Sequence, residues 1–276
     1  NLFKSKIRPK RVSLLQKGTL IIPCAGLGKR FSESDYKLPK PFIEVSGKPM
    51  INQAFDDLPS FENVKLIFRR EILNKYELSS KFRGDLKDAN IQIIDSITNG
   101  QASTCLLGLE NVDLSKPMMI SACDNGLIYD YKKFKELTQD DSIDLIVWGC
   151  RNFPGARKNP EMYGWIEEEN SIVKKVYVKK GYKNPKTDPI ITGTFYFGKA
   201  EIYKKLAEKL LKSEEKVNNE FYVDSAINIA IKLGLKVIYF EIDYYLCWGT
   251  PNDLKTYNYW QNCFHKWESH HYRKEI

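Results

Sequence analysis

The chain has 276 residues, of which 42% are hydrophobic and 28% are charged. This composition excludes a disordered chain, a collagen and a coiled coil, and the length allows one large domain or two small ones. The formal net charge of +8 raises nucleic acid or an anionic membrane as a partner. The excess lies in two acid-free stretches, 1–17 and 171–186, each with six Lys or Arg, and the remainder carries a net charge of −4. The sequence therefore describes a mildly acidic body with two basic stretches.

The six cysteines are far apart and form no Cys-x-x-Cys pair. Zinc-ligand spacing is absent, and a chain of this length does not need disulfides, so we expect a reduced, cytoplasmic protein. No apolar run approaches the roughly 20 residues that span a bilayer, and the basic N-terminus lacks the apolar region of a signal peptide. Because the first residue is Asn1, a fusion to an upstream domain stays open, as does a homo-oligomer.

The expected elements begin after residues 1–17, which we interpret as a basic arm or linker. Residues 18–23 form a continuous apolar run, the pattern of a strand buried on both faces. Strands and helices then alternate, with strands expected at 64–68, 91–94, 117–121 and 143–148, and helices at 49–58, 71–82, 101–109 and 131–137. This alternation predicts a parallel sheet covered on both faces.

The pattern changes after about residue 150. Residues 163–178 alternate like antiparallel strands, and 190–197 form another strand. Later elements are helices at 201–211, 222–233 and 252–267, with a last strand at 237–242. We therefore expect a Rossmann-like, three-layer α/β fold with a mostly parallel central sheet and a small antiparallel insertion. Ligands of such folds bind at the carboxyl ends of the strands.

A Gly-rich loop follows the first strand. Gly26 and Gly28 let the backbone approach a phosphate closely, its N–H groups can form an anion nest, and Lys29 and Arg30 add charge. The loop is not a dinucleotide fingerprint, because Phe31 stands where a third Gly is needed, and it is not a Walker A loop. By itself, such a loop is explained as well by an ordinary tight turn.

Two further segments make the pattern specific. Gly26-x-Gly28-x-Arg30-Phe31 is followed by Pro39-Lys40-Pro41 and Gly47-Lys48-Pro49. This string resembles the nucleotidyltransferase superfamily, which joins a nucleoside triphosphate to a sugar 1-phosphate or another small phosphate. It is most similar to the small nucleotidyltransferases of capsule and lipopolysaccharide gene clusters, relatives of the phosphocholine cytidylyltransferases. The resemblance implies a GT-A-like domain over 18–276, with a nucleotide-binding half (about 18–150), an acceptor-binding half (about 151–250) and a C-terminal helix (about 251–267).

The resemblance also implies roles for residues that match the family's motifs. Arg30 would face the leaving pyrophosphate, Lys40 would neutralise the reacting phosphates, and Lys180 would bind the phosphate of the acceptor. Asp124, after the fourth strand, matches the magnesium-binding position. The residues implied to bind the nucleotide are Ala25, Gly26, Gly28, Lys29, Gln101 and Ala102, and those implied to bind the acceptor are Gly164, Thr192, Gly193, Glu220 and Asp224.

The chain departs from the family near its end. The family typically reads Trp-x-Asp-x-Gly-Thr, with the Asp as a second metal ligand, but Cys247 stands at that Asp here. Three consequences are open. In the first, the metal is held by Asp124 with substrate phosphates and water. In the second, Glu241 or Asp243 replaces the missing ligand. In the third, catalysis is weakened or lost.

The resemblance implies a magnesium-dependent enzyme that transfers a nucleotidyl group from a nucleoside triphosphate, with CTP favoured, to a small phosphorylated acceptor. Pyrophosphate would be released, and the conjugate would serve capsule or lipopolysaccharide synthesis. Uridylyl, thymidylyl and guanylyl transfer stay open, as does a non-catalytic nucleotide-binding or regulatory homologue. A glycosyltransferase generally carries Asp-x-Asp where this chain has Asp124-Asn125-Gly126. Since no nucleic-acid reader motif is present, we do not expect nucleic acid as a partner. Since no apolar run is long enough to span a bilayer, we do not expect membrane insertion.

Overall fold

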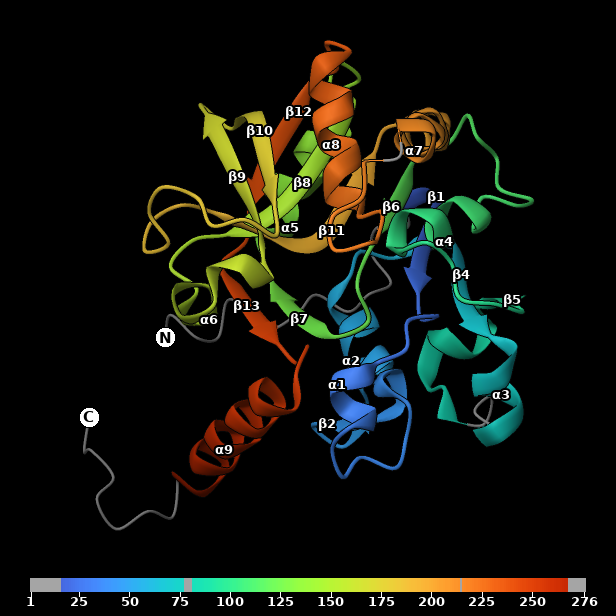
Figure 1. Ribbon diagram of the computed structural model, residues 1–276, viewed down its shortest axis with the longest axis vertical. Coiled ribbons are helices and arrows are strands. Elements are labelled where there is room, and N and C mark those ends of the chain that lie inside the picture. Colours follow the sequence, from blue (N-terminus) through green and yellow to red (C-terminus); the bar gives the residue numbers. More distant parts are fainter. Residues whose placement is uncertain (1–15, 77–80, 214, 268–276) are drawn as a thin grey trace.

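A nine-stranded mixed sheet forms the centre of the fold in residues 16–76, 81–213 and 215–267, which the computed structural model describes (Figure 1). From edge to edge its strands are β5 (Asn90–Ile94), β4 (Phe61–Arg69), β1 (Gln16–Pro23), β6 (Met118–Ile120), β11 (Ile190–Phe197), β8 (Leu145–Cys150), β12 (Val237–Glu241), β10 (Ile172–Val178) and β9 (Gly164–Glu169). Two small sheets accompany it: β2 (Glu44–Val45) with β3 (Lys48–Pro49), and β7 (Asn125–Ile128) with β13 (Tyr244–Cys247).

The parallel part of the sheet is built from apolar strands covered on both faces. β1 pairs in parallel with β4 and β6, and β4 pairs in parallel with β5. Leu20 and Ile22 pack into one buried cluster and Ile21 into another. Because successive side chains of a strand point to opposite faces, a continuous apolar run suits a strand between two layers. The predicted first strand is confirmed, although it begins at Gln16 rather than Gly18.

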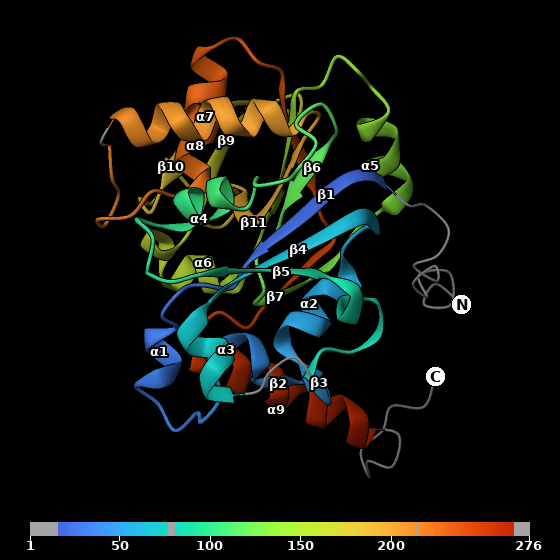
Figure 2. The same cartoon turned by 90° about the vertical axis from the view of Figure 1, so that its right-hand side faces the viewer.

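Helices cover the two faces of the sheet separately (Figure 2). On one face lie α4 (Gln101–Leu107), α7 (Ala200–Ser213) and α8 (Val223–Lys232), whose apolar side chains join the cluster that contains Ile21. On the other face lie α2 (Met50–Asp57) and α5 (Tyr131–Thr138). The predicted three-layer α/β architecture is therefore confirmed.

The antiparallel part reaches the middle of the sheet instead of staying at its edge. β11 runs antiparallel to both of its neighbours, β6 and β8. The hairpin of β9 and β10 forms the far edge, and β10 joins it to β12. β12 and β8 are again parallel. The sheet is mostly parallel, as expected, but the strand predicted at 190–197 interrupts its centre.

The remaining helices are α1 (Lys29–Ser32), α3 (Arg70–Tyr76), α6 (Pro154–Lys158) and α9 (Pro251–Trp267). The helix predicted over 71–82 is too long, because Phe82 is not helical; residues 77–80 lie outside the described part. Phe82 instead packs on Phe42 and Phe68, with ring centroids 5.6 and 6.1 Å away. An apolar residue in helical register thus serves the core from a loop. The predicted arm lies outside the described residues up to residue 15. Within the described ranges, no helix has the length and apolar character that crossing a bilayer requires.

Candidate active site

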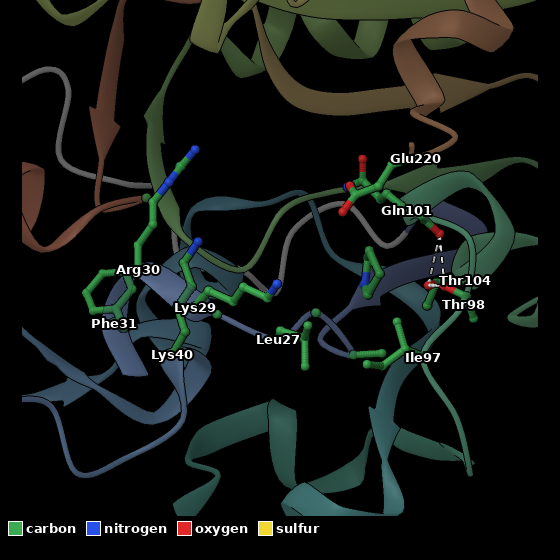
Figure 3. Close-up of a pocket in the computed structure, with 16 residues that line it drawn as sticks. Leu27, Lys29, Arg30, Phe31, Lys40, Ile97, Thr98, Gln101, Thr104 and Glu220 are labelled. Atoms are coloured by element: carbon green, nitrogen blue, oxygen red, sulfur yellow. Dashed lines mark hydrogen bonds between the residues drawn. The ribbon is translucent and has the colours of Figure 1, made fainter. Parts of the chain in front are cut away.

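A cavity lies at the carboxyl end of β1, where ligands of doubly wound sheets bind. Its lining comes from the loop after β1, the segment that leads into α4, and the single residues Lys40, Glu220 and Gly249 (Figure 3). Segments far apart in the sequence therefore meet there. Of the residues predicted to bind nucleotide, Ala25, Gly26, Gly28, Lys29 and Gln101 line this cavity, together with Arg30 and Lys40.

The Gly-rich loop is held in place by a buried aromatic residue, and its backbone is exposed to the cavity. Phe31 is buried at the base of the loop and makes an edge contact with Tyr36. Gly28 has a positive φ of 60°, which glycine adopts without strain, and is the N-cap residue of α1. A Cβ atom added at Gly26 would meet no atom within 4 Å. The loop therefore presents unobstructed backbone to the cavity, flanked by the exposed side chains of Lys29 and Arg30.

Lys40, which lines the cavity, forms an ion pair with Asp124. Lys40 begins a short 3-10 helix (Lys40–Phe42), and Asp124 lies in the loop that follows β6. Burial disfavours the ammonium form, but the Asp124 carboxylate outweighs it, so the pKa of Lys40 is raised above its ordinary value. The lysine is therefore cationic at neutral pH. The two residues that the resemblance assigns to the reacting phosphates and to the metal lie in direct contact.

Cys247 lies beside this pair as a neutral thiol. The Trp248 amide donates a hydrogen bond of 2.9 Å to the Asp124 carbonyl, which places the end of β13 next to Asp124. The Cys247 Sγ is 3.6 Å from Oδ2 of Asp253. Burial, together with these two carboxylates, raises the pKa of Cys247 to about 12. Because a thiol ligates metal as the thiolate, Cys247 does not supply the charge of the aspartate it replaces.

Both expected substitutes for the second metal ligand make contacts elsewhere. Glu241 ends β12 and pairs with Arg151 at 3.4 Å. The Asp243 amide donates to the Ile128 carbonyl at the far end of the β7–β13 ladder, roughly 13 Å along the strand from Asp124 at 3.3 Å per residue. No group of three or more His, Cys, Asp or Glu side chains in the described part of the chain is arranged to hold a metal ion. Glu241 or Asp243 as the second ligand therefore stays a prediction that these contacts do not support.

The segment before α4 is held in place by backbone hydrogen bonds to Phe221, which lies far away in the sequence. The Phe221 amide donates to the Asn99 carbonyl (2.8 Å), and the Ala102 amide donates to the Phe221 carbonyl (2.9 Å). Ala102 is fully buried, its carbonyl accepts from the Tyr203 hydroxyl, and it does not line the cavity. The Gln101 side chain extends into the cavity and forms no hydrogen bond to another described residue.

The predicted acceptor residues fall into two groups. Glu220 lines the same cavity as Gln101, whereas Gly164, Thr192, Gly193 and Asp224 do not. Asp224 packs directly beneath Gly164, where an added Cβ would lie 2.2 Å from Oδ2. Burial raises the pKa of Asp224, and Lys179 partly opposes the shift. The Thr192 hydroxyl donates to the Trp148 carbonyl, so its side chain is already engaged.

The structure turns Lys179, rather than Lys180, toward these residues. Lys180 is exposed. Lys179 adopts a left-handed φ of 50°, and its ammonium group donates to the Met162 carbonyl and lies over the Tyr222 ring, 5.4 Å from the centroid. Burial lowers the pKa of Lys179, and Asp224 opposes this. Sequence reasoning missed Lys179, because a Lys-Lys pair does not reveal where the backbone reverses.

A Gly-rich loop, a lysine and an aspartate thus lie at the carboxyl edge of a mixed sheet, and the chain is similar in sequence to curated bifunctional GlmU proteins and in fold to solved nucleotidyltransferases. No protein-family model matches the chain. Among curated proteins, the bifunctional protein GlmU of Campylobacter fetus subsp. fetus (strain 82-40) is 25% identical over 222 residues, which cover 79% of this chain and 47% of that protein. The chain spans about half the length of the curated relatives it matches.

Two solved structures illustrate the shared fold. The nucleoside-diphosphate-sugar pyrophosphorylase from Vibrio cholerae RC9 matches with a TM-score of 0.67 and 19% identity, over 86% of this chain and 98% of that chain. The inositol-1-phosphate CTP transferase from T. maritima matches with a TM-score of 0.65 and 18% identity, over 88% of this chain and 94% of that chain.

Proposed function

We propose that this chain is a magnesium-dependent nucleotidyltransferase, which transfers a nucleotidyl group from a nucleoside triphosphate to a small phosphorylated acceptor. The observation that carries the proposal is that the open Gly-rich loop, Arg30 and Lys40 line one cavity, with Asp124 paired to Lys40. The names of the similar structures, a sugar pyrophosphorylase and a CTP transferase, support the same reaction class.

In the proposed reaction, a phosphate oxygen of the acceptor attacks the α-phosphorus of the triphosphate in line, and pyrophosphate leaves. No covalent enzyme intermediate is needed, so the chain contributes positioning and charge. The Gly-rich loop would hold the triphosphate, Arg30 the leaving pyrophosphate and Lys40 the reacting phosphates. Lys179 replaces Lys180 in this proposal as the cation for the acceptor's phosphate, because Lys179 faces Asp224 and Tyr222.

Asp124 would hold the magnesium ion. Mg²⁺ is usually bound by one or two carboxylates together with substrate phosphates and water, so a single aspartate fits this ion even though Cys247 is neutral. When bound, the ion would neutralise charge on the phosphate oxygens. Asp124 pairs with Lys40 in the structure, and both side chains would turn to the triphosphate when it binds.

We further propose that the nucleotide is CTP. We also propose that the product is used in the synthesis of a surface polysaccharide, either a capsule or lipopolysaccharide. The support is the resemblance of the Pro-Lys and Gly-Thr-Pro segments to the small capsule-cluster enzymes, with the CTP transferase among the similar structures. A second candidate, a non-catalytic nucleotide-binding protein, is favoured by Cys247 alone.

A pyrophosphate-release screen tests the proposal. CTP, UTP, dTTP and GTP are each combined with a panel of sugar, alcohol and amino-acid phosphates in the presence of Mg²⁺. Release is expected with at least one pair, and it should stop when the metal is chelated. No release from any pair, with nucleotide binding intact, would favour the non-catalytic candidate.

The two neighbouring lysines give a matched pair of variants. Lys179→Met is expected to lower kcat/KM for the acceptor roughly 10- to 100-fold, because a charged hydrogen bond contributes about 1.5–3 kcal/mol. Lys180→Met should change it less than about twofold, because Lys180 is exposed. Steady-state kinetics at saturating nucleotide measure both. A loss in Lys180→Met with Lys179→Met unaffected would return the role to Lys180.

A further inference from the structure

Glu220 is fixed at the cavity by a tight turn. Val217 and Glu220 exchange two backbone hydrogen bonds of 3.0 Å, and the residues between them, Asn218 and Asn219, have φ angles of 49° and 64°. Two successive positive φ angles with Asn at both positions are typical of a type I′ turn. The backbone of Glu220 is therefore held in one conformation.

The same turn is fastened to the segment that carries Gln101. Phe221, directly after Glu220, is buried and bonds through its amide and carbonyl to Asn99 and Ala102. Gly100 leaves room for this approach, since an added Cβ would lie 2.5 Å from the Phe221 nitrogen. Glu220 and Gln101 are thus held on one wall of the cavity, and Figure 3 shows both side chains extending inward, across from Arg30 and Lys40.

This wall of the cavity combines the polar groups of Glu220 and Gln101 with apolar side chains. A carboxylate accepts hydrogen bonds, and the Gln101 amide can donate as well as accept. Leu27 and Ile97, 44% and 57% exposed, also line the cavity. Exposed apolar side chains beside an acceptor and an amide suit a planar heterocycle whose edge carries an amino group next to a ring acceptor.

We propose that Glu220 determines the choice of base: its carboxylate accepts a hydrogen bond from the exocyclic amine of cytosine, so the chain uses CTP in preference to UTP. Acidic side chains pair with cytosine N4 in this way, whereas uracil presents a carbonyl oxygen at that position, which the carboxylate repels. The inference rests on the proposed function and deepens it. It also moves Glu220 from the acceptor site expected from the sequence to the base site.

Binding titrations of CTP and UTP, each with Mg²⁺, test the inference on the wild type, Glu220→Gln and the control Glu215→Gln. Glu215 is exposed in the same loop and does not line the cavity. The wild type and the control should bind CTP at least about tenfold more tightly than UTP, because one hydrogen bond to a charged group contributes that much. Glu220→Gln should bring the ratio of the two dissociation constants close to one, since an amide can both accept from cytosine and donate to uracil.

Three outcomes overturn the inference. Equal weakening of CTP and UTP in Glu220→Gln would assign the carboxylate to the ribose, and a raised acceptor KM with an unchanged CTP-to-UTP ratio would return it to the acceptor. Preference for GTP over CTP in the wild type would assign the site to another amino-bearing base. Absence of binding by any of CTP, UTP, dTTP and GTP would instead contradict the proposed function itself.

Discussion

Replacing Lys40 with alanine is expected to lower kcat for nucleotidyl transfer about 10²- to 10³-fold, the loss seen when one preorganised electrostatic donor is removed, or roughly 2.7–4 kcal/mol of transition-state stabilisation. Lys40 is the cation in direct contact with Asp124 at the cavity, and its raised pKa keeps it charged. Charge builds up on the phosphate oxygens as the bond to pyrophosphate breaks, and the alanine variant has no ammonium group to meet it.

Two controls accompany Lys40→Ala. Lys37→Ala removes an exposed lysine from the same segment that does not line the cavity, and its kcat should stay within about twofold of wild type. Single-turnover measurements on Lys40→Ala separate chemistry from product release. Turnover of Lys40→Ala at the wild-type rate would remove Lys40 from the mechanism.

Gly100→Ala is expected to destabilise the protein and to weaken nucleotide binding together. The φ of 124° at Gly100 is one that only glycine adopts readily, and an added Cβ would lie 2.5 Å from the nitrogen and 2.6 Å from the oxygen of Phe221. Backbone strain of this kind costs about 1–3 kcal/mol. If the backbone of Phe221 moved away to relieve the strain, its hydrogen bonds to Asn99 and Ala102 would break.

Urea unfolding and nucleotide titration of Gly100→Ala measure the two effects. Gly181→Ala is the matched control, because its added Cβ would meet only Pro160, at an ordinary 3.6 Å. The control should keep its free energy of unfolding within about 0.5 kcal/mol. Wild-type stability and affinity in Gly100→Ala would mean that the close approach of Phe221 is not maintained in solution.

The sequence could predict those parts of the fold that depend on local pattern. The apolar run 18–23 predicted a strand between two layers, because only such a strand needs apolar side chains on both faces. The central position of β11 could not be predicted, because strand order depends on how distant segments cross over. The end of the helix after β4 was missed for a related reason, since Phe82 looks helical in spacing but packs on Phe42 and Phe68 from a loop.

In the candidate site, too, features that depend on local sequence could be predicted and those that depend on distant segments could not. The string from Gly26 to Lys40 predicted residues that share one cavity, because they are close in the chain and follow one strand. Lys179 was missed because a left-handed backbone conformation decides which of two adjacent lysines turns inward. The burial of Ala102 could not be predicted, because its amide donates to the carbonyl of Phe221, which lies far away in the sequence.

Mass spectrometry of the products formed from an acceptor whose phosphate is labelled with ¹⁸O tests nucleotidyl transfer most directly. Attack by the acceptor's phosphate on the α-phosphorus of CTP predicts a cytidine diphosphate conjugate that retains every labelled oxygen, together with unlabelled pyrophosphate. Labelled oxygen in pyrophosphate, or no conjugate in the presence of CTP, Mg²⁺ and each member of the acceptor panel, would contradict the proposed reaction.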